Sequence, residues 1–103
     1  MPRFVRVARA DEIRPGEKQI VEVDGMLVVV VNLNGQFYAL EDVCTHDGGP
    51  LGEGELEDGQ IVCPRHGAHF DVRTGAALTL PAFEPVPTYQ VQLIDGDLLV
   101  EAF

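Results

Sequence analysis

Four dipeptides, each an acidic or amide residue followed by glycine, divide the chain into short segments. They are Asp24-Gly25, Asn34-Gly35, Asp58-Gly59 and Asp95-Gly96. Such pairs are the strongest local signal for a two-residue β-hairpin turn, because both turn positions need a positive φ angle, which Asn, Asp and Gly tolerate best. Each dipeptide stands next to segments of strand composition. The chain is therefore predicted to fold into antiparallel strands joined by tight turns.

The predicted strands are short. They span residues 4–8, 18–23, 26–33, 36–41, 60–62, 89–94 and 98–103. Near the C-terminus, Tyr89, Val91 and Leu93 alternate with glutamines, which is the period of a strand with one buried face. Residues 28–31 are all valine, which is typical of a strand covered on both faces. Residues 11–15 predict one helical turn, and nothing predicts a long helix. The fold class is all-β, an antiparallel sandwich or small barrel.

The length of 103 residues predicts a single domain, 1–103. A hydrophobic content of 46% is ordinary for a globular protein and too high for a disordered one. The longest apolar run has six residues, 26–31, whereas a membrane span needs about 20. The N-terminus lacks the apolar stretch of a secretory signal. We therefore expect a cytoplasmic, monomeric protein whose thiols stay reduced.

The charge is acidic and unevenly distributed. Seventeen acidic and seven basic residues give a net charge of −10. This argues against a general binder of nucleic acid or anionic membranes, because both need a basic surface. Residues 1–18 hold five of the bases, whereas residues 19–64 hold nine acids and no base. Such a segment either steers a basic protein partner or is simply a solvated surface.

Four of the five cysteines and histidines form two short pairs. These are Cys44-Thr45-His46 and Cys63-Pro64-Arg65-His66. Each pair lies in a Gly- and Pro-rich segment that follows a predicted strand. The sixteen residues between His46 and Cys63 leave room for a turn and a returning strand, so the two loops can meet at one end of the sheet. Two thiolates and two imidazoles suit zinc or an iron–sulfur cluster.

The spacing favours a cluster over zinc. Structural zinc sites usually draw on Cys-x2–4-Cys and His-x3–5-His pairs, and neither is present. Mixed Cys/His pairs on two matching loops suit two inequivalent irons, one bound by the cysteines and the other by the histidines. The plainer alternative is a disulfide or two structural thiols. A reducing compartment and the matched histidines argue against it.

The sequence resembles the Rieske iron–sulfur proteins. The residues that carry the resemblance are Cys44-Thr45-His46, Gly49-Pro50-Leu51, Cys63-Pro64-Arg65-His66-Gly67 and Phe70-Asp71. It extends well over roughly residues 35–103, and over the first 34 residues by general strand pattern. It implies one [2Fe–2S] cluster with Cys44, His46, Cys63 and His66 as ligands. The ligands would lie in loops at about 42–54 and 63–70, at one end of the Rieske-type antiparallel sheet structure. Residues 81–87 form either a third loop that shields the cluster or an ordinary surface loop.

Within that family, the chain is similar to the small ferredoxins of bacterial aromatic-ring dioxygenase systems. It lacks a membrane anchor, a second cysteine pair for a disulfide, and a large catalytic domain. The resemblance implies a one-electron carrier, with no catalytic residue of its own, between a flavin-dependent ferredoxin reductase and a terminal oxygenase. The alternative is a non-catalytic small subunit of a larger oxidoreductase such as a nitrite reductase. A zinc-stabilised binding module is a third hypothesis.

Two neighbours of the second pair bear on the reduction potential. High-potential relatives have Ser and Tyr where this chain has Ala68 and Phe70, and their hydroxyls donate hydrogen bonds to the cluster or its cysteine sulfur. Without such donors the reduced, more negative cluster is less stabilised. We therefore expect a potential at the low end of the Rieske range of about −150 to +300 mV. His69 is expected not to be a ligand. Arg65 is expected to be a solvated surface residue, the alternative being a place beside the docking face.

Overall fold

The computed structural model describes residues 3–45, 48–65 and 67–102. These residues form ten strands and one short 3₁₀ helix, η1. In chain order the elements are β1 Arg3–Arg9, η1 Ala10–Glu12, β2 Lys18–Val23, β3 Met26–Leu33, β4 Gln36–Glu41, β5 Leu56–Glu57, β6 Gln60–Val62, β7 His69–Asp71, β8 Thr88–Tyr89, β9 Val91–Ile94 and β10 Asp97–Ala102. No helix in the described part of the chain is long and apolar enough to cross a membrane.

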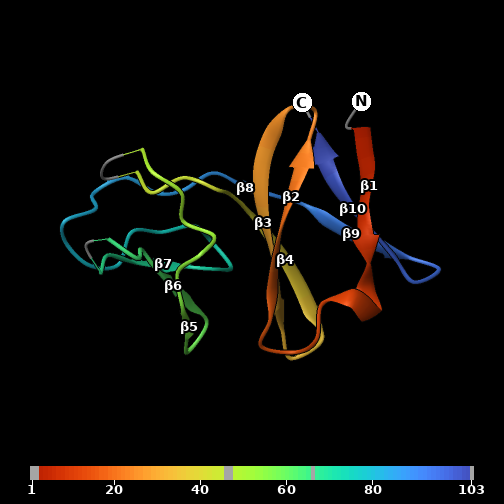
Figure 1. Cartoon of the computed structure of the whole chain (residues 1–103), viewed down its shortest axis with the longest axis horizontal. Helices are drawn as coiled ribbons and strands as arrows, with labels where there is room; N and C mark the ends of the chain where they lie inside the picture. The colour runs from red at the N-terminus through yellow and green to blue at the C-terminus, as the bar shows by residue number, and fades with distance from the viewer. Residues whose placement is uncertain (1–2, 46–47, 66, 103) are drawn as a thin grey trace.

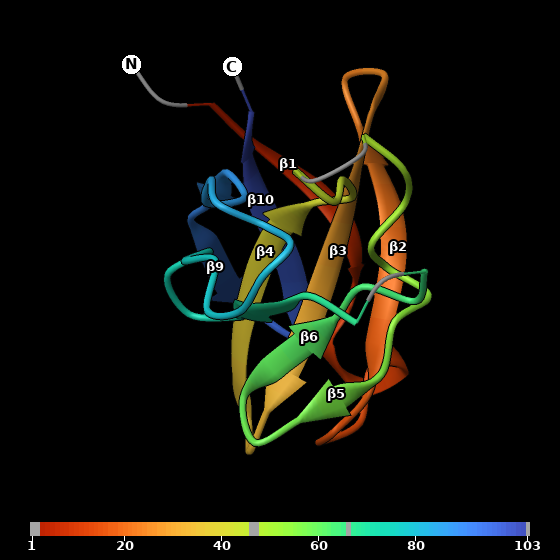
Figure 2. The same ribbon diagram turned by 90° about the vertical axis from the view of Figure 1, so that its left-hand side faces the viewer.

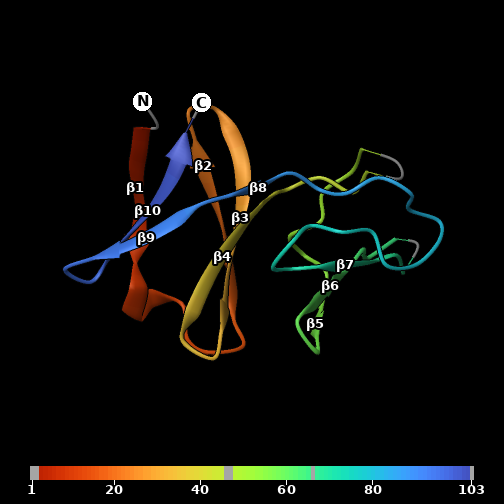
Figure 3. The same ribbon diagram turned by 180° about the vertical axis from the view of Figure 1, so that it is seen from behind.

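The strands form three antiparallel sheets stacked as layers. Their orders are β1-β10-β9, β2-β3-β4-β8 and β5-β6-β7. Figure 1 shows the β2-β3-β4 sheet in the middle, with β1, β9 and β10 on one side of it and the β5-β6-β7 unit on the other. The view from behind gives the same order of layers (Figure 3). The structure thus confirms the all-β antiparallel fold and adds a third small sheet between β4 and β8 in the chain.

Both faces of β3 are buried. Val28 and Val30 pack with Leu98 and Val100 in a core between the first two sheets. Their neighbours in β3, Val29 and Val31, belong to a second core that also contains Cys44 and Cys63. Because successive strand residues point to opposite faces, each pair of valines faces one core. This explains why the valine run does not alternate with polar residues. It confirms the prediction of a strand covered on both faces.

The dipeptides Asp24-Gly25, Asn34-Gly35, Asp58-Gly59 and Asp95-Gly96 adopt the predicted turn conformation. The φ angles at the first residue lie between 49° and 53°, and those at the glycine between 76° and 92°. Positive φ at both central residues is the mark of a type I′ turn. The turns join β2 to β3, β3 to β4, β5 to β6 and β9 to β10.

The strand predictions were accurate except where strands are very short. The bounds of β2, β3, β4 and β6 agree with those predicted, whereas Gln90 separates β8 from β9. Strands β5 and β7 were not predicted, because two or three residues carry no readable alternation. Since β7 begins at His69 and pairs with β6, the second loop ends at Ala68, not at residue 70. The helical turn spans Ala10–Glu12 where residues 11–15 were predicted.

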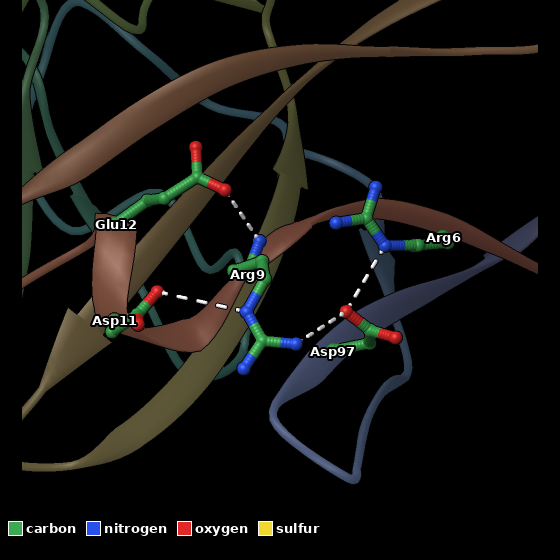
Figure 4. Close-up of polar contacts among 5 residues, drawn as sticks. All are labelled: Arg6, Arg9, Asp11, Glu12 and Asp97. Atoms are coloured by element: carbon green, nitrogen blue, oxygen red, sulfur yellow. Dashed lines mark hydrogen bonds and ion pairs between the residues drawn. The ribbon is translucent and has the colours of Figure 1, made fainter.

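The N-terminal arginines pair with carboxylates at the end of the molecule formed by β1 and β10. Asp97 Oδ1 lies 3.0 Å from Arg6 Nε and 3.3 Å from Arg9 Nη1. The backbone N–H of Arg9 donates to Glu12 Oε1 at 2.9 Å, which holds the start of the 3₁₀ turn (Figure 4). All these side chains are partly exposed, so each pair stabilises the fold only slightly. Three of the five bases of residues 1–18, Arg3, Arg6 and Arg9, are therefore paired with acids.

Candidate metal centre

Both cysteines are buried in one apolar core. Cys44 follows β4 by three residues, and Cys63 directly follows β6. Their side chains share a cluster of buried residues with Leu51, Ala68 and Phe70. Neither cysteine forms a disulfide. The structure therefore places two buried thiols, not joined by a disulfide, in one core, and they come from the two loops that the sequence singled out.

The two cysteines begin loops of the same design. The backbone N–H of Cys44 donates to the carbonyl of Gly49 at 2.7 Å, and its own carbonyl accepts from the N–H of Gly48 at 2.7 Å. Cys63 repeats this pattern with Ala68 at 2.8 Å and Gly67 at 3.0 Å. In each loop the bonded residues follow the cysteine by five and four positions.

The glycine four positions after each cysteine makes this closure possible. Gly48 and Gly67 have φ angles of 77° and 73°, in the left-handed region that glycine enters most readily. His46 lies inside the first closed loop in sequence, and His66 inside the second. The two histidines themselves lie outside the described residues. Among the residues described, no three His, Cys, Asp or Glu side chains form a metal site.

The first loop, residues 42–54, is held in place by a carboxylate. Asp42 Oδ1 accepts hydrogen bonds from the backbone N–H groups of Leu51 at 2.8 Å and Gly52 at 2.6 Å. On the other side, Lys18 Nζ on β2 donates to the carbonyl of Gly52 at 2.5 Å. One carboxylate thus ties the start of this loop to its far end. Sequence reasoning missed the role of Asp42, although an acid just before a Gly-rich loop was a readable signal.

The tips of the first and second loops touch. The guanidinium of Arg65 lies against Gly49, so that a Cβ atom added at Gly49 would overlap it. At the base of the loops, Gly54 lies so near the carbonyl oxygen of Val62 that a Cβ atom there would fall 1.8 Å from it. Two glycines therefore let the loops approach at both ends. The sequence had placed Arg65 on the surface, where it is indeed exposed, but not as a bridge between loops.

A third loop, residues 78–87, lies at the same end of the molecule (Figures 1 and 2). The hydroxyl of Thr45 donates to the carbonyl of Glu84 at 2.6 Å, which joins this loop to the first one. Ala82 and Val86 are buried in the same core as the two cysteines. The third loop therefore contacts the first loop and packs into the core that contains both thiols, which favours the first of the two readings of residues 81–87.

The side chain of His69 contacts a glutamine on the neighbouring strand. Its Nδ1 atom is 2.8 Å from Gln60 Oε1, across the β6–β7 pair. Ala68 and Phe70, on either side of it, are fully buried and carry no hydroxyl. The described residues therefore fit the cysteine half of a Cys₂His₂ cluster site, because they place two buried thiols on two loops of the same design. His69 contacts Gln60 instead.

Comparison with known proteins shows the family. The model of the Rieske [2Fe-2S] domain matches residues 3–90. The chain belongs to the Rieske [2Fe-2S] domain family. This confirms the resemblance drawn from the two Cys/His pairs, and it extends the match almost to the N-terminus.

Curated relatives match over most of their length. The ferredoxin component of biphenyl 2,3-dioxygenase from Rhodococcus jostii (strain RHA1) is 38% identical over 98 residues, which cover 95% of this chain and 92% of that protein. The 3-phenylpropionate/cinnamic acid dioxygenase ferredoxin subunit of Escherichia coli (strain K12) is 40% identical over 87 residues, which cover 82% of each chain.

Solved structures also match this chain over most of their length. The ferredoxin of carbazole 1,9a-dioxygenase from Nocardioides aromaticivorans IC177 superposes with a TM-score of 0.90 at 38% identity, over 94% of this chain and 95% of that one. A chain of a complex of reduced oxygenase and oxidized ferredoxin in carbazole 1,9a-dioxygenase gives a TM-score of 0.90 at 34% identity, over 95% of this chain and 92% of that one.

Proposed function

We propose that Cys44 and Cys63 bind one iron of a Rieske [2Fe–2S] cluster and that His46 and His66 bind the other. The support is the pair of twin loops, each closed around one buried thiol and each carrying one histidine in sequence. Thiolate sulfur and imidazole nitrogen are the donors that such a centre uses. When bound, the cluster takes up and releases one electron at a time.

The residues around the thiols set the conditions for that electron. Leu51, Ala68 and Phe70 exclude water from the two sulfurs. No side-chain hydroxyl comes from Ala68 or Phe70, so the added negative charge gains no hydrogen bond from these two positions. We expect a reduction potential at the low end of the Rieske range for this reason.

The function that these features support best is that of an electron carrier. In this proposal the protein accepts single electrons from a flavin-dependent ferredoxin reductase in the cytoplasm and passes them to a terminal oxygenase. It catalyses no bond chemistry itself. The observation that carries the proposal is the pair of closed Cys loops within a chain that matches dioxygenase ferredoxins over nearly their whole length. The names of these relatives favour the carrier over a permanent small subunit of a nitrite reductase.

The ligand assignment is tested by replacing each histidine in turn. His46→Ala and His66→Ala should each lose the cluster or its characteristic EPR signal in the purified protein. His69→Ala is the matched control, because His69 contacts Gln60, and it should keep both. If His69→Ala lost the signal while His46→Ala and His66→Ala kept it, the ligand assignment would be contradicted.

The carrier function is tested by exchange in a dioxygenase system. This protein would replace the ferredoxin component of the biphenyl dioxygenase of Rhodococcus jostii (strain RHA1), with NADH as the electron source. We expect NADH-dependent oxidation of biphenyl with the holoprotein and none with the Cys63→Ser variant. Reduction of the holoprotein by the reductase without any oxidation of biphenyl would count against an oxygenase of this kind as partner.

A further inference from the structure

The third loop carries the most exposed apolar side chains in the described part of the molecule. Phe83 is 82% exposed and Leu80 is 70% exposed, and Leu78 in the same loop is 45% exposed. The other large exposed apolar residues there lie on the sheets: Ile20, Leu27, Leu93 and Ile94. Single exposed apolar residues are normal, but three in one loop beside a functional site indicate a contact surface. We refer to Leu78, Leu80 and Phe83 as the apolar rim.

The apolar rim is held by the structure around it. Ala82 and Val86 are buried on either side of Phe83 and fix the loop to the core that contains both cysteines. The N–H of Leu78 donates to the carbonyl of His69 at 2.8 Å, and the hydroxyl of Thr79 accepts from the N–H of His69 at 2.9 Å. An exposed side chain on a backbone that is already ordered loses little entropy when a partner covers it. The apolar rim is thus suited to docking.

The apolar rim is also directly connected to the first loop. Glu84 follows Phe83, and its carbonyl accepts the hydroxyl hydrogen of Thr45, the residue that precedes His46 in the chain. A protein that comes close enough to the loop tips to exchange an electron would therefore also lie beside the third loop, which carries Phe83. This step rests on the proposed function.

The opposite side of the loop tips is acidic. Glu53 and Glu55 are exposed and line a groove together with Pro64 and Gly67 of the second loop. Figure 2 faces this end of the molecule and shows the third loop on one side of the tips and the segment that leads into β5 on the other. Arg65 is the exposed base of the second loop, and its guanidinium lies against Gly49. The surface around the tips is thus apolar on one flank and carries carboxylates on the other.

We propose that the apolar rim is an anchor of the docking surface for the electron-transfer partner. The partner is a redox protein that presents an apolar patch to Phe83 and Leu80, and basic side chains to Glu53 and Glu55. Aromatic residues at the centre of an interface commonly dominate its binding free energy, whereas charged residues at its periphery mainly raise the association rate. Phe83 is therefore the residue on which docking depends most.

The test compares two substitutions of exposed apolar residues. Phe83→Ser removes the anchor, and Leu93→Ser removes a 55% exposed side chain on β9, away from the tips. Both holoproteins would be reduced with dithionite and mixed in stopped flow with cytochrome c, a basic haem protein. Ferricyanide, a small acceptor that needs no docking surface, serves as the second acceptor for each sample.

We expect Phe83→Ser to lower the second-order rate constant with cytochrome c by about fivefold or more, which is about 1 kcal/mol. Its rate with ferricyanide and both rates of Leu93→Ser should stay within about twofold of the wild type. Equal rates with cytochrome c for the two variants would overturn the docking surface and leave the carrier function intact. A wild-type protein that reduces neither acceptor would overturn the carrier function and this surface together.

Discussion

At the scale of single residues, the site depends on what stands at fixed distances from each cysteine. A glycine four positions on and a carbonyl five positions on close both loops in the same way. The histidine stands two positions after Cys44 but three after Cys63. The two loops thus close in the same way, although their histidines stand at different positions in the sequence.

Ala68 is buried beside Cys63. Its carbonyl accepts the hydrogen bond from the Cys63 N–H that closes the second loop. Ala68→Ser introduces a hydroxyl donor into this core. A hydrogen bond to the cluster or its cysteine sulfur stabilises the reduced state, so we expect the potential to rise by about 60 mV, or about 1.4 kcal/mol for one electron. Redox titration followed by EPR measures it. An unchanged or lower potential would show that Ala68 does not set the low value.

At the scale of elements, the loops are placed by glycines that allow close backbone approach. Gly54→Ala would drive a Cβ atom into the carbonyl of Val62, which cannot move without shifting β6. We expect this variant to lose about 1–3 kcal/mol of unfolding free energy, measured with urea. Gly49→Ala is the matched control in the same loop, because it meets only the mobile end of Arg65 and should lose much less. Equal losses would contradict this packing.

The contact between β4 and β8 predicts a pH dependence. The hydroxyl of Tyr89 donates to Glu41 Oε1 at 3.2 Å, and burial together with the nearby carboxylate raises the pKa of Tyr89 from 10.0 to about 12. A pKa raised by folding means that the protonated phenol stabilises the fold below about pH 10. That stabilisation is lost as the pH rises towards 12.

The measurement is the free energy of unfolding at pH 9 and at pH 11.5. We expect it to fall more in the wild type than in Tyr89→Phe, which has no phenolic proton to lose. A parallel decline in the two proteins would show that Tyr89 titrates at its ordinary pKa in the fold.

Elements are also where prediction from sequence succeeded or failed for physical reasons. An Asp-Gly or Asn-Gly turn takes its conformation from two residues, so all four turns were predicted, and the bounds of β2, β3 and β4 around the first two of them were accurate. Strand β5 has two residues, Leu56 and Glu57, whose pairing comes from tertiary packing and leaves no pattern. The place of Asp42 before a Gly-rich loop was a signal of its role, but its partners could not be read, because Leu51 and Gly52 are nine and ten residues away in the chain.

At the scale of the whole molecule, function is divided between layers. Two sheets form a rigid support, and the third sheet carries the loops on the outer face of the middle one (Figure 1). Charge follows a related division, since five of the seven bases lie in residues 1–18 and none in residues 19–64. The first and third loops add acids at the site end, whereas the arginines of β1 are paired with Asp24 in the β2–β3 turn and with Asp97 on β10.

This distribution predicts a salt effect on electron transfer. With a net charge of −10, the protein should attract a basic partner over distances that salt screens. The second-order rate constant for reduction of cytochrome c should fall by about tenfold between roughly 0.01 and 0.3 M ionic strength. An uncharged small acceptor, a quinone, should show little change and serves as the control. A rate that rises with salt for cytochrome c would indicate that the docking face is not acidic.

The central claim is that two cysteines and two histidines hold one [2Fe–2S] cluster. Its most direct test is EPR of the purified protein after dithionite reduction, with pulsed detection of nitrogen nuclei coupled to the electron spin. We predict a red-brown protein that bleaches on reduction. It should give a rhombic signal whose average g value is below that of all-cysteine clusters, with two strongly coupled nitrogens. A colourless protein with stoichiometric zinc, or a cluster signal without coupled nitrogen, would contradict the account.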